Sequence, residues 1–122
     1  FVVRVAGNVI GPLELDSIDY AALYLGSVCI VVLGHEGCGA VKAVVEGTTK
    51  DIEAIAKLIT PAVQKAKQSS TGDLLTKAIK DNALRMKEYL LKAKVIKKLV
   101  QEKKIDVHAA YYDLNTGAVE WL

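Results

Sequence analysis

The chain has 122 residues, of which 52% are hydrophobic, 6% aromatic and 25% charged, with a formal net charge of +2. This length and apolar content predict a single domain, residues 1–122, with a buried core. The apolar residues are mostly Val, Ile, Leu and Ala, which favours parallel strands and helices over a β-sandwich. The balanced charge excludes a basic nucleic-acid surface, and no apolar stretch approaches the roughly 20 residues that span a bilayer, so we expect neither a nucleic-acid nor a membrane partner.

The N-terminal part of the sequence predicts a strand, a loop and a short helix. Phe1–Val5 is almost entirely apolar and reads as a buried strand, which the Ala6–Asn8 segment breaks. Asp16 or Ser17 can cap the helix that follows, because either side chain can accept a hydrogen bond from a free N–H of the first turn. Gly26 then suits the position just after the helix.

Cys29–Leu33 is the clearest strand in the sequence, and it is followed by a glycine-rich loop. The strand is apolar on both faces, which is typical of a central parallel strand, and Cys29 is interpreted as a small core residue. The loop has the sequence GHEGCG, and a helix is expected from about Ala40. Polar residues therefore lie at the carboxyl end of a strand, where open α/β sheets place their sites.

The rest of the chain predicts helices and then two strands. Apolar residues keep a helical period over residues 52–66, and Pro61 is expected to kink or restart that helix. Residues 68–72 are expected to form a loop, with Asp73 as the cap of the next helix. Residues 105–111 alternate as a strand, and a turn at 113–117 leads to a last strand at or near the sheet edge. These elements predict an α/β fold with a mostly parallel sheet flanked by helices and a short C-terminal hairpin strand.

One pair of residues in the glycine-rich loop can bind a metal. His35 and Cys38 lie three positions apart, and an imidazole nitrogen and a thiolate at that spacing can converge on one Zn²⁺ ion. The neighbouring glycines permit the tight backbone that aims both side chains inward. Taken alone the H-x-x-C pattern is weak, because such a pair near a loop is more often structural than metal-binding.

Four segments place this pattern in the context of a family. They are FVVRVAGN (1–8), SIDYA (17–21), VVLGHEGCGAV (31–41) and AYYDLNTGAVE (110–120). In this order and spacing they resemble the β-class carbonic anhydrases, zinc enzymes that interconvert carbon dioxide and bicarbonate. The resemblance runs through essentially the whole chain.

The resemblance implies a zinc site made of two cysteines and one histidine, in which His35 and Cys38 match the second and third ligands. It implies a substrate pocket at four further positions: Ala6, Gly7, Asn8 and Gly39. The family's Cys-x-Asp-Ser-Arg motif, which carries the first cysteine and an Asp–Arg pair that gates the fourth zinc position, does not occur in this sequence. No catalytic residue beyond the zinc site is therefore expected from this chain.

Several interpretations follow from the resemblance and remain open at this stage. The leading function is zinc-dependent hydration of carbon dioxide to bicarbonate, and the alternatives are a catalytically silent oligomeric relative or a hydrolase of carbon disulfide or carbonyl sulfide. The chain is either part of a longer protein or a shortened relative. We expect self-association as a dimer or larger assembly. Two cysteines make no disulfide framework, so a cytoplasmic location is expected, with an organelle or carboxysome left open.

Overall fold

The structure, a computed structural model, describes residues 1–68 and 72–122. Over those residues it contains five α-helices, one short 3₁₀ helix and three strands. In chain order they are η1 (Ala6–Asn8), α1 (Pro12–Tyr24), β1 (Cys29–His35), α2 (Gly39–Glu46), α3 (Glu53–Lys67), α4 (Leu74–Lys92), α5 (Lys94–Gln101), β2 (Asp106–Tyr112) and β3 (Val119–Trp121). The expected α/β class is confirmed. The loop expected at residues 68–72 falls largely outside the described residues.

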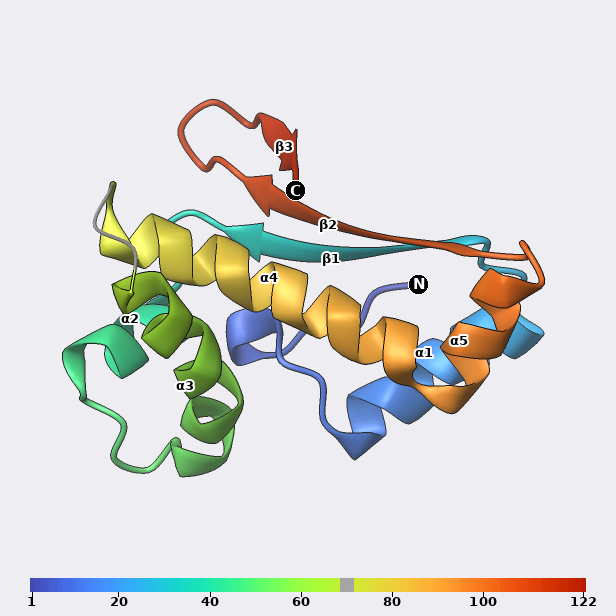
Figure 1. The fold of residues 1–122 in the computed structure, drawn as a ribbon, viewed down its shortest axis with the longest axis horizontal. Helices are drawn as coiled ribbons and strands as arrows, with labels where there is room; N and C mark the ends of the chain where they lie inside the picture. The colour runs from blue at the N-terminus through green and yellow to red at the C-terminus, as the bar shows by residue number, and fades with distance from the viewer. Residues whose placement is uncertain (69–71) are drawn as a thin grey trace.

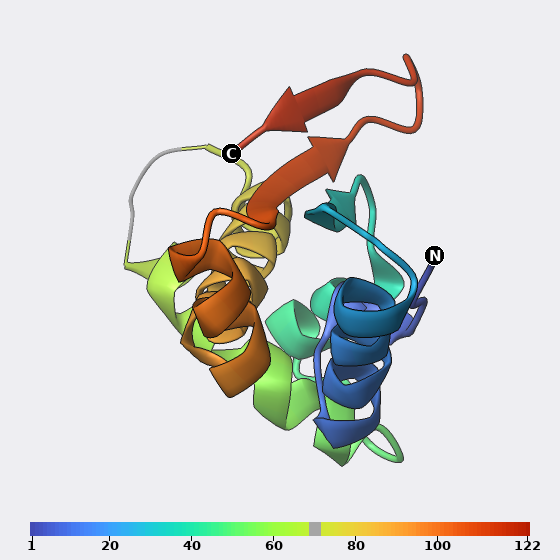
Figure 2. The same cartoon turned by 90° about the vertical axis from the view of Figure 1, so that its right-hand side faces the viewer.

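The sheet has the order β1–β2–β3, with helices gathered on one side of it (Figures 1 and 2). β1 and β2 are parallel, in a register that runs from Cys29 opposite Asp106 to His35 opposite Tyr112. β2 and β3 are antiparallel and form the C-terminal hairpin, with β3 at the edge as expected. The sheet is therefore mostly parallel, and only its short last strand is reversed.

The core lies between the sheet and α4, which runs along β1 and β2 (Figure 1). Side chains from both layers are buried there: Val32, Ile79, Ala83, Leu90, Val107 and Ala109. Gly34 permits the close approach of the layers, because a Cβ at that position would lie 3.0 Å from Ile79 Cγ2. None of the described helices is long and apolar enough to cross a membrane.

The expectation that Cys29–Leu33 is a central strand is wrong, because β1 lies at an edge of the observed sheet. Its even-numbered side chains face the helices, whereas Val31 and Leu33 on the other face are 42% and 43% exposed. Cys29 is also exposed and is not a core residue. The apolar composition predicts burial on both faces, but helices cover only one face of this strand.

Phe1–Val5 forms no strand in the structure, which corrects a second expectation. Phe1 and Val2 are 70% and 83% exposed. A groove of roughly 350 Å³ lies here, lined by this segment, β1 and α1. Strand structure requires hydrogen bonds from a neighbour, and no described strand pairs with these five residues.

Two helix predictions also change, while two are confirmed. α1 begins at Pro12 rather than near Asp16, because the Gly11 N–H is bonded to Glu14 Oε2 at 2.9 Å and proline suits a first helical position. α3 continues through Pro61, so the restart that was one of the two expected effects does not occur. Gly26 has a left-handed φ of 70° after α1 as expected, and Asp73 caps α4 by accepting a hydrogen bond from the Thr76 N–H at 2.8 Å.

Candidate metal centre

The two candidate metal ligands lie on either side of a tight turn after β1. His35 is the last residue of β1, and Cys38 immediately precedes the first residue of α2. Gly37 has a φ of +64°, a left-handed conformation that favours glycine, and open space around its Cα. The sequence thus makes the chain turn within three residues, with His35 at the end of β1 and Cys38 just before α2.

The His35 ring is oriented by a contact through one of its nitrogens. Its Nδ1 lies 2.8 Å from the carbonyl oxygen of Glu36. A carbonyl oxygen can only accept a hydrogen bond, so Nδ1 is the donor in this contact. Metal-binding histidines commonly donate their second ring nitrogen to a carbonyl or carboxylate in this way, and His35 is an exposed residue.

Cys38 contributes a buried thiol, with 3% of the residue exposed, that belongs to the hydrophobic core cluster. Its carbonyl accepts the Lys42 N–H at 2.9 Å, which fixes it at the start of α2. Nitrogen and sulfur are both suitable zinc donors. Within residues 1–68 and 72–122, however, no group of three or more His, Cys, Asp or Glu side chains is placed to hold a metal. The described residues therefore offer two donors of the kind zinc accepts and do not complete a metal site.

The expected substrate-pocket residues are brought to the same end of α2. Ala6–Asn8 forms η1, in which Gly7 is buried with a φ of +71°. A Cβ on Gly7 would lie 3.4 Å from Ala40 Cβ and 2.6 Å from Ile59 Cδ1, so only glycine fits against α2 and α3 here. Gly39 is exposed at the first position of α2. The structure thus places η1 beside the helix start that follows Cys38.

Asn82 holds η1 in place and was missed as a site residue. It is fully buried on α4, and its Nδ2 donates to the Gly7 carbonyl at 2.8 Å. The sequence did contain an indication, since Asn82 interrupts the otherwise apolar stripe of this helix. A buried amide on such a stripe should have a hydrogen-bond partner, although the sequence does not say which one.

Glu36 was also missed, and it connects the loop to the β2–β3 turn. Its carboxylate accepts the Leu114 N–H at 3.1 Å and lies 2.9 Å from Asn115 Nδ2 through both oxygens. In the same turn, hydrogen bonds from Thr116 hold the pKa of Asp113 below its ordinary value. The residue between the two candidate ligands is therefore anchored to a turn that is itself hydrogen-bonded.

Comparison with known proteins bears on what this arrangement does. The family model described as carbonic anhydrase matches residues 1–119. A carbonic anhydrase of Mycolicibacterium smegmatis is 60% identical over 43 residues, which are 35% of this chain and 21% of that protein. The matched stretch thus covers about a fifth of that relative's length.

Two solved structures show the same fold. The β-carbonic anhydrase CcaA superimposes with a TM-score of 0.82 at 23% identity, over 98% of this chain and 65% of the other. A β-carbonic anhydrase of Sordaria macrospora, described as tetrameric, gives a TM-score of 0.75 at 19% identity, over 100% of this chain and 67% of the other. At these identities the structures establish the architecture alone.

Proposed function

Because the chain belongs to the β-class carbonic anhydrase family, we propose that it serves the zinc-dependent, reversible hydration of carbon dioxide to bicarbonate. The observation that carries the proposal is the donor pair after β1, an exposed His35 and a buried Cys38 three residues apart across one tight turn. Both residues lie within the part of the chain that the family model matches. The pair stands at the carboxyl end of a parallel strand, where α/β folds place their sites.

The chain's own residues hold and shape this site. His35 and Cys38 would bind the ion, which when bound supplies a Lewis acid that makes water nucleophilic near neutral pH. The bond from Nδ1 to the Glu36 carbonyl sets the tautomer and orientation of the imidazole. Asn82 fixes the carbonyl of Gly7, so that η1 forms a wall beside the start of α2. Activity requires further donors, which the described residues do not bring to this pair.

The test measures zinc stoichiometry and carbon dioxide hydration on the same sample. We expect Cys38→Ser to lose most bound zinc, because a hydroxyl is a much poorer ligand than a thiolate. Cys29→Ser is the matched control, since that thiol is exposed on β1 and away from the loop. Unchanged zinc content in Cys38→Ser would contradict the proposed site. A stable oligomer without zinc or activity would instead favour a catalytically silent relative.

We further propose that the chain self-associates, with a dimer as the smallest unit. Large apolar side chains are exposed, including Phe1, Val2, Tyr24 and Trp121 at 64–83%. Such surfaces mark interaction sites when they are contiguous, and an obligate interface buries about 2,000 Å² or more. Sedimentation at low micromolar concentration tests the proposal, and a single 13.1 kDa species would contradict it.

A further inference from the structure

Glu36 occupies the position between the two candidate ligands, and all of its polar groups are hydrogen-bonded. Its N–H donates to the Tyr112 carbonyl at 2.8 Å, and its own carbonyl accepts from His35 Nδ1. Its carboxylate accepts the Leu114 N–H at 3.1 Å and the Asn115 side-chain amide at 2.9 Å. The loop is therefore tied, by backbone and side chain, to the end of β2 and the turn beyond it.

The turn that receives Glu36 is organised by its own contacts. Asp113 Oδ1 accepts the N–H groups of Asn115 and Thr116 at 2.8 and 2.9 Å. The Gly117 N–H donates to the Asp113 carbonyl at 2.9 Å, and the Asp113 N–H donates to Ala118 at 2.9 Å. Glu36 thus binds a turn that has several hydrogen bonds of its own, so the turn can act as a support for the loop.

The loop has few supports of this kind between the end of β1 and Cys38. The His35 side chain is exposed, and a Cβ on Gly37 would contact nothing within 4 Å. A segment with so little packing loses conformational entropy when it holds a ligand in one geometry, and a pre-existing anchor reduces that loss. Groups that orient metal ligands commonly contribute tenfold or more to metal affinity in the same way.

We propose that Glu36 and Asn115 form a positioning pair, which fixes the loop that carries His35 and Cys38 and thereby strengthens zinc binding. The inference rests on the proposed zinc site, but the pair itself is a property of the folded chain without metal. Asn115 is the more informative of the two residues, because it is neutral. Its replacement breaks the contact and leaves the negative charge of Glu36 in place, which separates anchoring from simple attraction of the cation.

The experiment compares Glu36→Ala, Asn115→Ala and the double variant in a Cys29→Ser background, so that Cys38 is the only thiol. Zinc affinity is measured by competition with a chelator, and the rate of Cys38 modification by a soluble disulfide reagent is measured in metal-free protein. We expect each single variant to weaken zinc binding by about tenfold and to raise the modification rate severalfold. The double variant should resemble the singles, since the residues act as one unit.

Two control variants match the changes without touching the contact. Thr116→Ala alters the same turn at a side chain that contacts the Ala118 N–H and Asp113 but not Glu36, and Glu46→Gln removes a carboxylate from α2, the next element after the loop, where it pairs with Lys42 at 3.7 Å. Both controls should keep the parent's zinc affinity and thiol reactivity. The absorption spectrum of the cobalt form should change in Asn115→Ala and not in Thr116→Ala, because it reports ligand geometry.

The outcomes separate this inference from the proposed function. Parent-like thiol reactivity in both Glu36→Ala and Asn115→Ala would overturn the positioning pair. An effect of Glu36→Ala without any effect of Asn115→Ala would also overturn it, since charge alone would then explain zinc binding. If no variant, including the parent, binds zinc, the proposed function fails, while the modification rates still decide whether the pair orders the loop.

Discussion

β2 and the Phe1–Val5 segment have similar apolar, strand-favouring sequences but end in different structures. β2 pairs with β1 on one side and β3 on the other, and Val107 and Ala109 are buried beneath it. Phe1–Val5 pairs with no described strand, and Val2 is 83% exposed. Composition is therefore not what distinguishes them. The difference is the presence of neighbours that complete the backbone hydrogen bonds and cover one face.

The comparison shows that strand propensity measures suitability for a pleated, half-buried surface rather than an intrinsic preference of the backbone. The same point applies within β1, whose inner edge pairs along its full length with β2. Its outer edge faces the groove beside Phe1–Val5. β1 is thus hydrogen-bonded to another described strand along one edge only.

The largest expected effect contrasts a core side chain with one in the unpaired segment. Ile79 is 1% exposed on α4, under the sheet, and Ile79→Ala should lower the free energy of unfolding by about 2–5 kcal/mol through lost burial and the cavity left behind. Val2→Ala, at an exposed position, should change it by less than about 0.5 kcal/mol. Urea denaturation measures both, and equal effects would mean that Phe1–Val5 is packed in solution.

A smaller effect on the free energy of unfolding is expected at Gly7, the first buried residue of the chain. Gly7 and Gly26 have nearly the same φ, +71° and +70°, but a Cβ would lie 2.6 Å from Ile59 Cδ1 at Gly7 and contact nothing within 4 Å at Gly26. Alanine at either site carries the same left-handed strain, so the difference between Gly7→Ala and Gly26→Ala isolates overpacking. We expect Gly7→Ala to cost roughly 1–3 kcal/mol more in the same denaturation measurement.

Similar destabilisation by the two glycine variants would mean that η1 is not held against α3. The Asn82 bond to the Gly7 carbonyl would then also lack its stated role. The part of the N-terminal region that does not pack against the helices would then extend beyond Phe1–Val5.

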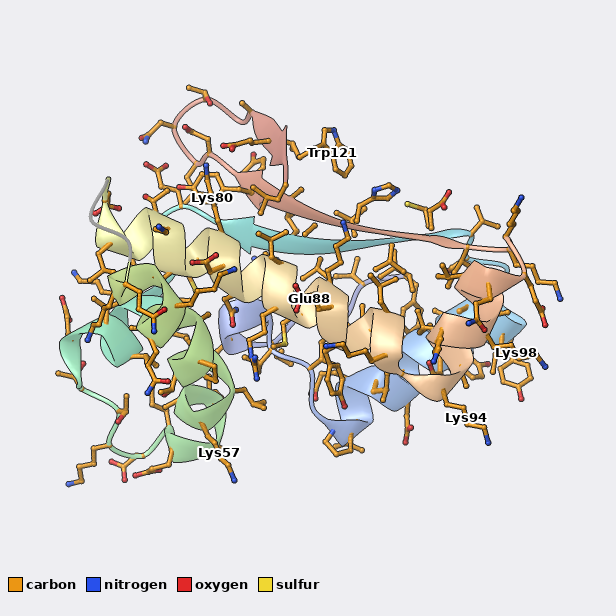
Figure 3. All side chains as sticks on the ribbon, in the orientation of Figure 1. Lys57, Lys80, Glu88, Lys94, Lys98 and Trp121 are labelled. Carbon is orange, nitrogen blue, oxygen red and sulfur yellow. The ribbon has the colours of Figure 1, made fainter. Side chains whose placement is uncertain are left out.

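The smallest expected effect on the free energy of unfolding concerns the ion pair between α4 and the β2–β3 hairpin. Lys80 on α4 lies beside the β2–β3 hairpin (Figure 3), with its Nζ 2.6 Å from Glu120 Oε2 and 4.9 Å from the centre of the Tyr111 ring. Lys80→Met should cost less than about 1 kcal/mol, because the pair is partly exposed, and the cost should shrink in high salt. Lys98→Met, which removes a looser pair with Glu102 at 3.9 Å, is the control. A loss of several kcal/mol would show that β3 depends on this contact.

Much of the fold could be predicted because its determinants are local. The apolar runs of β1 and β2, the helical period that gives α3 and the cap at Asp73 all lie within a few residues of the structure they specify. The wrong predictions concern which strands and helices lie beside an element. The position of β1 in the sheet and the state of Phe1–Val5 depend on neighbours that a local pattern does not identify.

The site shows the same division. His35 and Cys38 are candidate ligands because the segments around them resemble a family, and the structure places their loop at the end of β1. The residues that support the loop are distant in sequence: Glu36 and Asn115 are 79 positions apart, and Asn82 and Gly7 are 75 apart. Hydrogen-bond partners at such separations are set by the packing of whole elements, so only the structure reveals them.

The register of the sheet has a consequence for the time course of folding. The β2–β3 hairpin needs only the turn at 113–117 to close, and hairpins form in about 1–10 μs. Pairing β1 with β2 instead requires Cys29 to meet Asp106 across the whole of α2 to α5, and such distant contacts slow folding. We therefore expect the turn that anchors Glu36 to form early and the loop after β1 to reach it later. Until then the exposed edges of β1 and β2 are available to other chains, and the yield of refolding should fall as protein concentration rises.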